Sequence, residues 1–415
     1  MKPYLLCLAV MLLWVMACKR SEPAKPVKPA EMKQVPLTSS QKSVIGESNA
    51  FGFAFYKAMQ PFAPAGQNLM VSPLSISMAL GMTRNGAAGS TLDSMTGTLG
   101  YTGMADTAIN GSYRYLLNTF TGLDPLVTVM IANSIWYRNT FPVLPSFVEV
   151  NRDYFSASVT PLDFTDPSSV TTINSWVSDR TSHLIPQIIQ SIPPEMVMYL
   201  INAVYFKGSW RSEFDKSSTL PKPFTLADGS IIQAPAMKQQ NHFNYFQGGG
   251  FQAVELPYNQ GNFNMIVLLP AVGSSPAALA AQLTKEKWEE WIRNFSSSDV
   301  ILQLPKFSYE YDEASMVPIL TAMGMEIAFD PLHADFTRIN AGGGLYISEV
   351  KHKTAIKTDE EGTVAAAVTS IGVGATSAGP GSTVYFTVDR PFLYFISEKS
   401  TGTILFIGTV MDPLH

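Results

Sequence analysis

The feature that most constrains the fold is an uncharged run of small residues close to the C-terminus. No charged residue lies between Glu361 and Asp389, and small residues make up nearly all of the stretch up to Thr383. Its later part is rich in glycine, which predicts a loop. Its earlier part, residues 363–370, contains β-branched residues and alanines without a breaker, and this pattern predicts a strand buried on both faces. The segment is therefore compatible with two states, an exposed loop and a central strand.

The composition of this segment is equally typical of a solvated linker of alanine, glycine, serine and threonine. Two apolar segments, Val384–Val388 and Thr403–Val410, follow it and are predicted to be strands. Because these strands belong to a folded body, the segment lies inside a domain and not between domains.

The length and composition of the chain predict one large domain. It has 415 residues, of which 46% are hydrophobic, and this is ample for a large buried core. No internal repeat or linker interrupts the body, so one domain is preferred over the two or three that length alone suggests. The net charge is −5 and no basic stripe is visible, so no nucleic acid partner is expected. Both cysteines, Cys7 and Cys18, precede the body, which excludes a disulfide there.

The N-terminus has the pattern of a secretion signal. Lys2 precedes an apolar run, Tyr4–Ala17, that is shorter than the roughly 20 residues of a membrane span. We expect residues 1–17 to be a signal peptide, because the tetrapeptide that ends at Cys18 resembles the lipobox of bacterial lipoproteins. An ordinary signal peptide with an incidental cysteine is the alternative.

Lipidation of Cys18 would attach the protein to a membrane without spanning it. Residues 18–43, rich in lysine, proline and serine, are then expected to be a flexible tether. The protein is expected in a bacterial cell envelope. Lys19 differs from the aspartate that retains enterobacterial lipoproteins at the inner membrane, which favours the outer membrane, on either its periplasmic or its outer face.

The sequence lacks the short motifs of common enzyme classes. It contains no Gly-x-Ser-x-Gly, no His-Glu-x-x-His and no phosphate-binding glycine loop. Its 5 histidines are dispersed, and we interpret them as structural. We therefore expect no catalytic residue, no metal and no cofactor, while a triad scattered along the sequence stays open as an alternative.

Several landmarks recur along the body. Val44–Met59 has apolar residues at helical spacing, and Ser72 can cap a second helix whose first residue is Pro73. Val127–Tyr137 is a long apolar run that predicts a buried strand, and the strand pattern of Tyr199–Trp210 ends at a glycine and an aromatic residue.

These landmarks resemble the serpins, a family of large suicide inhibitors of serine proteases. Glu360–Ala367 resembles the serpin hinge, and the segment after it resembles the reactive-centre loop. Tyr199–Trp210 carries the pattern Asn-x-x-x-Phe-Lys-Gly-x-Trp, which is among the more specific signatures of the family. Val170–Ile189 resembles the helix across the main sheet, and Leu302–Phe307, Tyr346–Lys357 and the closing strands match as well, so that the resemblance covers about Val44–Pro413.

The resemblance implies an α+β fold in a single domain, residues 44–415, that is a monomer. Its main mixed β-sheet can accept an inserted strand, and helices and a second sheet or barrel surround it. The reactive-centre loop would span about residues 361–383.

The resemblance also implies three sets of functional residues. The hinge that enters the sheet would be Glu360, Glu361, Gly362, Thr363, Val364, Ala365, Ala366, Ala367 and Val368. A hydrogen-bonded network beneath the sheet opening, the shutter, would comprise Ser72, Ser75, Asn202 and His352. The breach, where the loop enters the sheet, would comprise Trp210, Lys306 and Glu360.

A serpin of this kind would act as a suicide substrate. A serine protease would form a covalent acyl-enzyme at the scissile bond, and the freed hinge would insert into the sheet and distort the protease. Family spacing places the scissile bond at Thr376–Ser377, with Ala375 or Val373 as alternatives. The small residues there suit elastase- or subtilisin-type proteases. A non-inhibitory serpin that serves as a binding module and, less favoured, a hydrolase are the alternatives.

Overall fold

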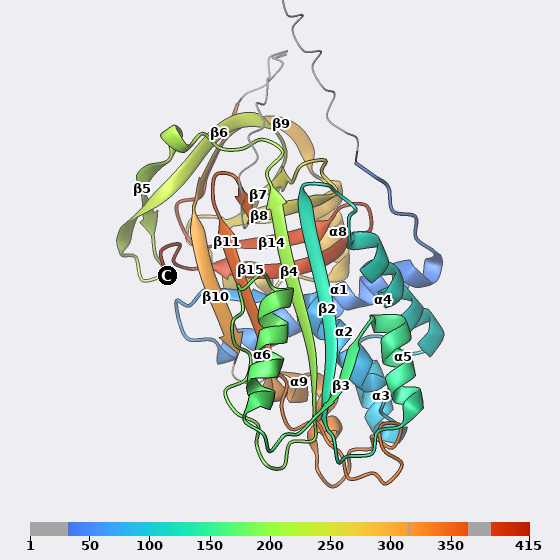
Figure 1. Ribbon diagram of the computed structural model, residues 1–415. Helices are drawn as coiled ribbons and strands as arrows, with labels where there is room; N and C mark the ends of the chain where they lie inside the picture. The colour runs from blue at the N-terminus through green and yellow to red at the C-terminus, as the bar shows by residue number, and fades with distance from the viewer. Residues whose placement is uncertain (1–31, 314–315, 364–382) are drawn as a thin grey trace, which may run out of the picture. The chain divides into compact units, whose positions relative to one another are not determined.

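The packed body begins earlier in the chain than the sequence predicts. The computed structural model describes residues 32–313, 316–363 and 383–415, and Met32–His415 form one compact unit (Figure 1). Helix α1 is Ser39–Met59, because the side chains of Thr38 and Gln41 each accept a hydrogen bond from the other residue's backbone N–H. The predicted tether up to residue 43 is therefore wrong from Met32 onward. The predicted signal peptide and Cys18 lie outside the described residues.

Within the described residues, the main sheet has six strands, which come from distant parts of the chain. Its strands follow the order β10 (Phe307–Glu313), β11 (His352–Thr358), β12 (Gly362–Thr363), β4 (Met198–Ser209), β2 (Val127–Arg138) and β3 (Ser158–Leu162). Only the pairing of β2 with β3 is parallel. The prediction of a mixed main sheet is confirmed.

A second sheet supplies a large share of the apolar core. Its order is β1 (Leu69–Val71), β15 (Thr403–Val410), β14 (Phe392–Glu398), β8 (Phe263–Pro270), β7 (Phe251–Pro257), β6 (Ile231–Gly248), β9 (Ser296–Pro305) and β13 (Val384–Thr387), and β5 (Leu220–Thr225) pairs with β6. Every residue of β8, β14 and β15 is buried, which is why these strands appear in the sequence as continuous apolar runs.

Helices cover both faces of the main sheet. Helix α6 (Ser168–Arg180) lies in front of the sheet, runs alongside β4 and contacts β4 and β2, and α1 and α2 (Pro73–Arg84) lie behind (Figure 1). The remaining helices are α3 (Gly89–Thr98), α4 (Asp106–Phe120), α5 (Pro145–Phe155), α7 (Pro276–Ala280), α8 (Lys285–Arg293) and α9 (Val317–Leu320), with shorter turns at Gln60–Phe62, Lys216–Ser218, Thr321–Met325 and Glu326–Phe329. In the described part of the chain, no helix is long and apolar enough to cross a membrane.

Two predicted elements are shorter than the sequence indicates. Helix α6 ends at Arg180 and not at Ile189, because Ser182 and His183 adopt left-handed backbone angles, with φ of 48° and 64°. The strand before the hinge begins at His352 and not at Tyr346. Its ladder with β10 ends at the pair Glu313–His352, and the preceding residues have no ladder partner in the described part of the chain.

Candidate functional site

The hinge of the loop is already part of the main sheet at its upper end. Strand β12 consists of Gly362 and Thr363 and lies between β11 and β4. Thr363 is paired with Gly208 of β4 on one side and with Thr358 of β11 on the other. Thr363 is also the last described residue before residue 383. The sequence places these two residues in an exposed loop; the structure corrects this, because both are buried.

A close backbone approach explains the glycine at position 362. A Cβ atom on Gly362 would lie 2.1 Å from the Gly208 carbonyl oxygen and 2.8 Å from the Ser209 Cα. Both atoms belong to the backbone of β4, so neither can rotate away. Any larger residue at position 362 would therefore separate β12 from β4.

Two buried hydroxyl groups hold the Thr363 side chain. Its Oγ1 lies 2.6 Å from the Tyr258 hydroxyl and 3.3 Å from Oγ1 of Thr358. The Tyr258 ring stacks on Trp210, with centroids 4.5 Å apart and planes 9° apart, and burial raises the pKa of its phenol. A side chain at Gly208 would meet this ring at 2.8 Å, so the glycine leaves room for it. Tyr258 follows β7 and thus ties the second sheet to the hinge.

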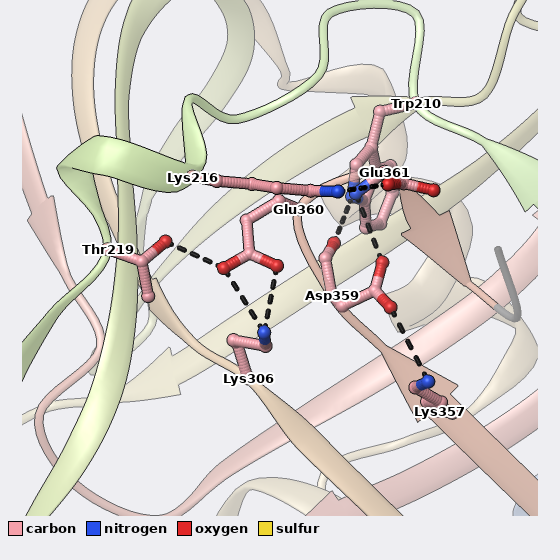
Figure 2. Close-up of polar contacts among 8 residues, drawn as sticks. All are labelled: Trp210, Lys216, Thr219, Lys306, Lys357, Asp359, Glu360 and Glu361. Atoms are coloured by element: carbon pink, nitrogen blue, oxygen red, sulfur yellow. Dashed lines mark hydrogen bonds and ion pairs between the residues drawn. The ribbon is translucent and has the colours of Figure 1, made fainter. Parts of the chain in front are cut away.

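Three consecutive acidic residues before β12 each face a different lysine (Figure 2). Lys306 lies 2.8 Å from the Glu360 carboxylate, as predicted for the breach, and Lys216 pairs with Glu361. Lys357 lies 3.8 Å from Asp359. These pairs fix the chain at its point of entry into the sheet.

The Glu360 carboxylate is the most buried of the three, at 7% side-chain exposure. Burial raises the pKa of this group, but hydrogen bonds from Lys306, its own backbone and Thr219 outweigh burial, so the pKa lies below its ordinary value. Trp210, the third predicted breach residue, donates from its indole N–H to the Asp359 carbonyl oxygen at 2.9 Å (Figure 2). The structure thus brings the predicted breach residues together.

Below β12, the slot between β4 and β11 is not filled by any described strand. Neither strand has another partner on the facing edge in the described residues. A cavity of about 200 Å³ lies at the lower end of this slot, lined by the first residues of β4, by the segment 344–352 that leads into β11 and by the adjoining face of α2. Among the described residues, the slot therefore has a head occupied by β12 and a foot without a strand.

The predicted shutter network is present only in part. Ser72 caps α2 by accepting from the Ser75 N–H, and the Ser72 N–H donates to His352 Nε2 at 3.0 Å. Burial lowers the pKa of His352 to about 4, so this ring is neutral near pH 7 and accepts the bond. Asn202 is not bonded to these residues, and the predicted closed set is wrong on this point.

Asn202 instead faces a residue that the sequence did not single out. Its Nδ2 donates to Asn133 Oδ1 at 2.6 Å and lies 3.8 Å from the Met78 sulfur. Asn133 in turn donates to the Phe155 carbonyl oxygen. The Oδ1 atom of Asn202 is buried, and no described residue donates a hydrogen bond to it. The sequence does contain a signal for Asn133, because this polar residue interrupts the apolar run Val127–Tyr137.

Other residues escaped sequence analysis because their partners are distant in the chain. Tyr258, Thr219 and Lys216 surround the hinge, yet no short motif joins them to it. The predicted residues Val364–Val368, Val373, Ala375, Thr376 and Ser377 lie outside the described residues. The described residues contain no group of acidic, histidine or cysteine side chains arranged to hold a metal.

Comparisons with known proteins agree with this geometry. The family model "Serpin (serine protease inhibitor)" matches residues 46–413. Human neuroserpin is 33% identical over 84% of this chain and 86% of its own length. The structure of a thermophilic serpin, tengpin, in its native state superposes with a TM-score of 0.82 at 32% identity, covering 93% of this chain and 97% of that one.

Human thyroxine-binding globulin, solved in complex with its ligand, superposes with the same TM-score of 0.82 at 26% identity and covers 91% of this chain and 100% of its own. The chain thus belongs to the serpin family, whose members are generally protease inhibitors and not hydrolases.

Proposed function

We propose that the protein inhibits serine proteases as a suicide substrate. The observation that carries the proposal is the slot: its head holds Gly362–Thr363, and below this point no described strand lies between β4 and β11. The sequence after Thr363 has no charge and no proline before residue 380, so its side chains are suited to a buried central strand. A strand added there would gain ladder hydrogen bonds on both edges.

The covalent step follows ordinary acyl transfer. The protease serine oxygen attacks the carbonyl carbon of the scissile residue, Thr376, and the peptide bond to Ser377 breaks. The Ser377 amine leaves with a proton, and Thr376 stays linked to the protease as an ester. Insertion of the freed strand would carry this ester away from the loop and distort the protease before water hydrolyses it. The small residues around Thr376 favour elastase- or subtilisin-type proteases.

Gel electrophoresis tests this proposal. The purified protein is mixed with elastase-, subtilisin-, trypsin- and chymotrypsin-type proteases, and the products are denatured. We expect a covalent complex with a small-pocket protease, and the mass of the released C-terminal peptide then identifies the scissile bond. Cleavage without any complex would contradict the proposal.

A binding role is the second candidate, since thyroxine-binding globulin has the same fold and a small-molecule ligand. Cleavage without a complex would favour this role if the intact protein also binds a small molecule that stabilises it.

We also propose that the protein is anchored in a bacterial envelope by a lipid on Cys18. The support is the sequence Val15–Cys18 after an apolar run. A Cys18→Ala variant should lose both fatty-acid labelling and membrane association in cell fractionation. A variant that is still labelled would refute the anchor.

A further inference from the structure

The cavity at the foot of the slot is large enough for a small molecule. Its volume is about 200 Å³, and an apolar cavity of about 150 Å³ already holds benzene. Glu195 and Tyr346 line it and are exposed, so the cavity is open to solvent on their side. Most of its wall is apolar and can surround the apolar body of a ligand. This part of the wall includes Ile76, Leu80, Met198, Ile201, Phe336 and Ile339.

A buried phenol lines this cavity without a hydrogen-bond partner. Tyr199 is 8% exposed, its ring centroid lies 5.9 Å from that of Phe164, and no described residue bonds to its hydroxyl. Buried tyrosine hydroxyls usually have a partner. Burial and the negative charges of Glu349 and Glu195 raise the pKa of Tyr199 to about 12, so the hydroxyl keeps its proton near pH 7. This hydroxyl can therefore donate one hydrogen bond to a ligand and accept another.

The second unpaired group is the side-chain oxygen of Asn202. Its Oδ1 atom is buried, and Asn202 also lines the cavity. Its amide nitrogen is already in contact with Asn133 and Met78, and an amide oxygen can only accept, so a ligand must supply the donor. Asn202 and Tyr199 are three residues apart on β4, which turns their side chains to opposite faces of the sheet and separates their Cα atoms by about 10 Å. Only an elongated ligand would reach both.

The Tyr199 end of the cavity is acidic. Glu195 and Glu349 both line the cavity, and their charges act on the Tyr199 phenol. Lys351 lies 3.3 Å from Glu349 and offsets one of the two carboxylates. His352 also lines the cavity, but burial lowers its pKa to about 4, so it is neutral near pH 7. Two carboxylates against one ammonium leave one negative charge, which favours a cationic ligand at this end.

From these contacts we infer that the cavity is a binding site for a small organic amine. The apolar body of the amine would fill the cavity, its ammonium group would donate to Tyr199 beside Glu195, and a hydroxyl at its other end would donate to Asn202. One ligand of this kind satisfies both unpaired groups and the unbalanced charge. The inference goes beyond the proposed inhibition and does not depend on it, because the intact protein would bind the amine without cleavage.

Isothermal titration calorimetry of the intact protein with three matched compounds tests the inference. Tyramine carries a hydroxyl and an ammonium group at opposite ends of one ring, phenethylamine lacks the hydroxyl, and 4-ethylphenol lacks the amine. We expect tyramine to bind. Each of the other two compounds should bind about tenfold more weakly, which is the effect of one lost hydrogen bond to a buried group.

Single substitutions assign each end of the ligand. Asn202→Ala should weaken tyramine binding about tenfold and leave phenethylamine binding unchanged, because phenethylamine has no hydroxyl to donate. Tyr199→Phe should weaken the binding of both amines about tenfold and leave that of 4-ethylphenol unchanged. Glu195→Gln should weaken the binding of both amines, most strongly at low salt. Glu149→Gln is the matched control and should change nothing, because Glu149 is an exposed residue of α5 outside the cavity.

Three results would overturn the inference. Equal affinities for the three compounds would show that shape alone selects them, and a tyramine affinity unchanged in both Tyr199→Phe and Glu195→Gln would place the amine elsewhere. Absence of tyramine binding at millimolar concentration would mean that the chain itself or a second copy fills the foot, and sedimentation of the protein separates these two cases. Because Glu195 is exposed, its variant decides the question even if Asn202→Ala does not fold.

Failure of this inference and failure of the proposed function are distinguishable. Cleavage without a covalent complex would refute inhibition and leave amine binding intact. Absence of tyramine binding would refute this site and leave inhibition intact.

Discussion

Replacing Gly362 by alanine should separate the hinge from the sheet. The added Cβ would lie 2.1 Å from the Gly208 carbonyl oxygen, more than 1 Å inside normal contact, and the atom it meets is held in the β2–β4 ladder. The backbone of β12 must therefore move outward by at least that amount. Hydrogen bonds do not survive a displacement of this size.

The hydrogen bonds that would be lost determine the expected decrease in stability. Thr363 would lose its bonds to Tyr258 and Thr358, and the Asp359 N–H would lose the Gly362 carbonyl oxygen that it reaches at 2.9 Å. At about 1 kcal/mol for each hydrogen bond, the intact form should lose about 3 kcal/mol of stability. The same clash would meet an inserting strand at its first step, so Gly362→Ala should also turn the inhibitor into a substrate.

Two measurements check this prediction. Denaturant unfolding of the intact form should show the lower stability, and gel electrophoresis should show more cleaved protein for each covalent complex formed. Gly111→Ala is the matched control, because it lies within α4 with nothing inside 4 Å of the added Cβ and should be neutral or stabilising by up to about 1 kcal/mol. A Gly362→Ala variant with unchanged stability and unchanged complex formation would refute the close-approach argument.

Three further predictions concern the contacts around the slot. Tyr258→Phe keeps the ring on Trp210 but removes the hydroxyl from Thr363, and should cost about 1–2 kcal/mol in denaturant unfolding; the loss should not add to that of Thr363→Val, since both remove one bond. Lys306→Ala leaves the Glu360 carboxylate buried without its ion-pair partner and should lower the free energy of unfolding by about 1–3 kcal/mol. Lys287→Ala is the control, because its pair with Glu290 is half exposed on both sides, and it should lower the free energy of unfolding by well under 1 kcal/mol. Equal losses in the two variants would contradict the burial argument. His352 has a pKa of about 4 against an ordinary 6.5, so the folded state binds its proton less readily than the unfolded state. The free energy of unfolding should therefore be highest above pH 6.5 and fall by about 3 kcal/mol as the pH drops to 4. In unfolding curves measured across this pH range, a His352→Gln variant should lack this part of the pH dependence.

The parts of this site that were predictable depend on local chemistry. The hinge could be found because strand insertion demands small, uncharged side chains in sequence, and Ser72 because a cap followed by proline is a local signal. Lys306 and Glu360 came from resemblance to a family, and the structure places them in contact.

The parts that were not predictable depend on tertiary contacts. Tyr258 and Thr363 are 105 positions apart, and nothing in either local sequence indicates the other. Asn202 was expected to bond with His352, but its amide donates to Asn133, its opposite residue in the β2–β4 ladder. The start of the packed body before residue 44 was not predictable for the same reason. The backbone of Lys33 forms hydrogen bonds with the side chain of Asn262, which is 229 positions away in the chain.

The two ends of the slot differ, and this difference bears on how one sequence could be compatible with both an exposed loop and a central strand. At its head, β12 has strand partners on both edges. Its first position accepts only glycine, and the hydroxyl of its second residue, Thr363, is hydrogen-bonded to Tyr258 and Thr358. At its foot, β4 and β11 lack a partner on their facing edges within the described chain, and an asparagine oxygen is buried alone. Strand pairing is cooperative from an existing pair, since the register and the loop-closure entropy are already settled there. If the chain inserts as proposed, insertion that begins at β12 would proceed from satisfied contacts toward unsatisfied ones, and each added pair of ladder hydrogen bonds would lower the free energy of the sheet.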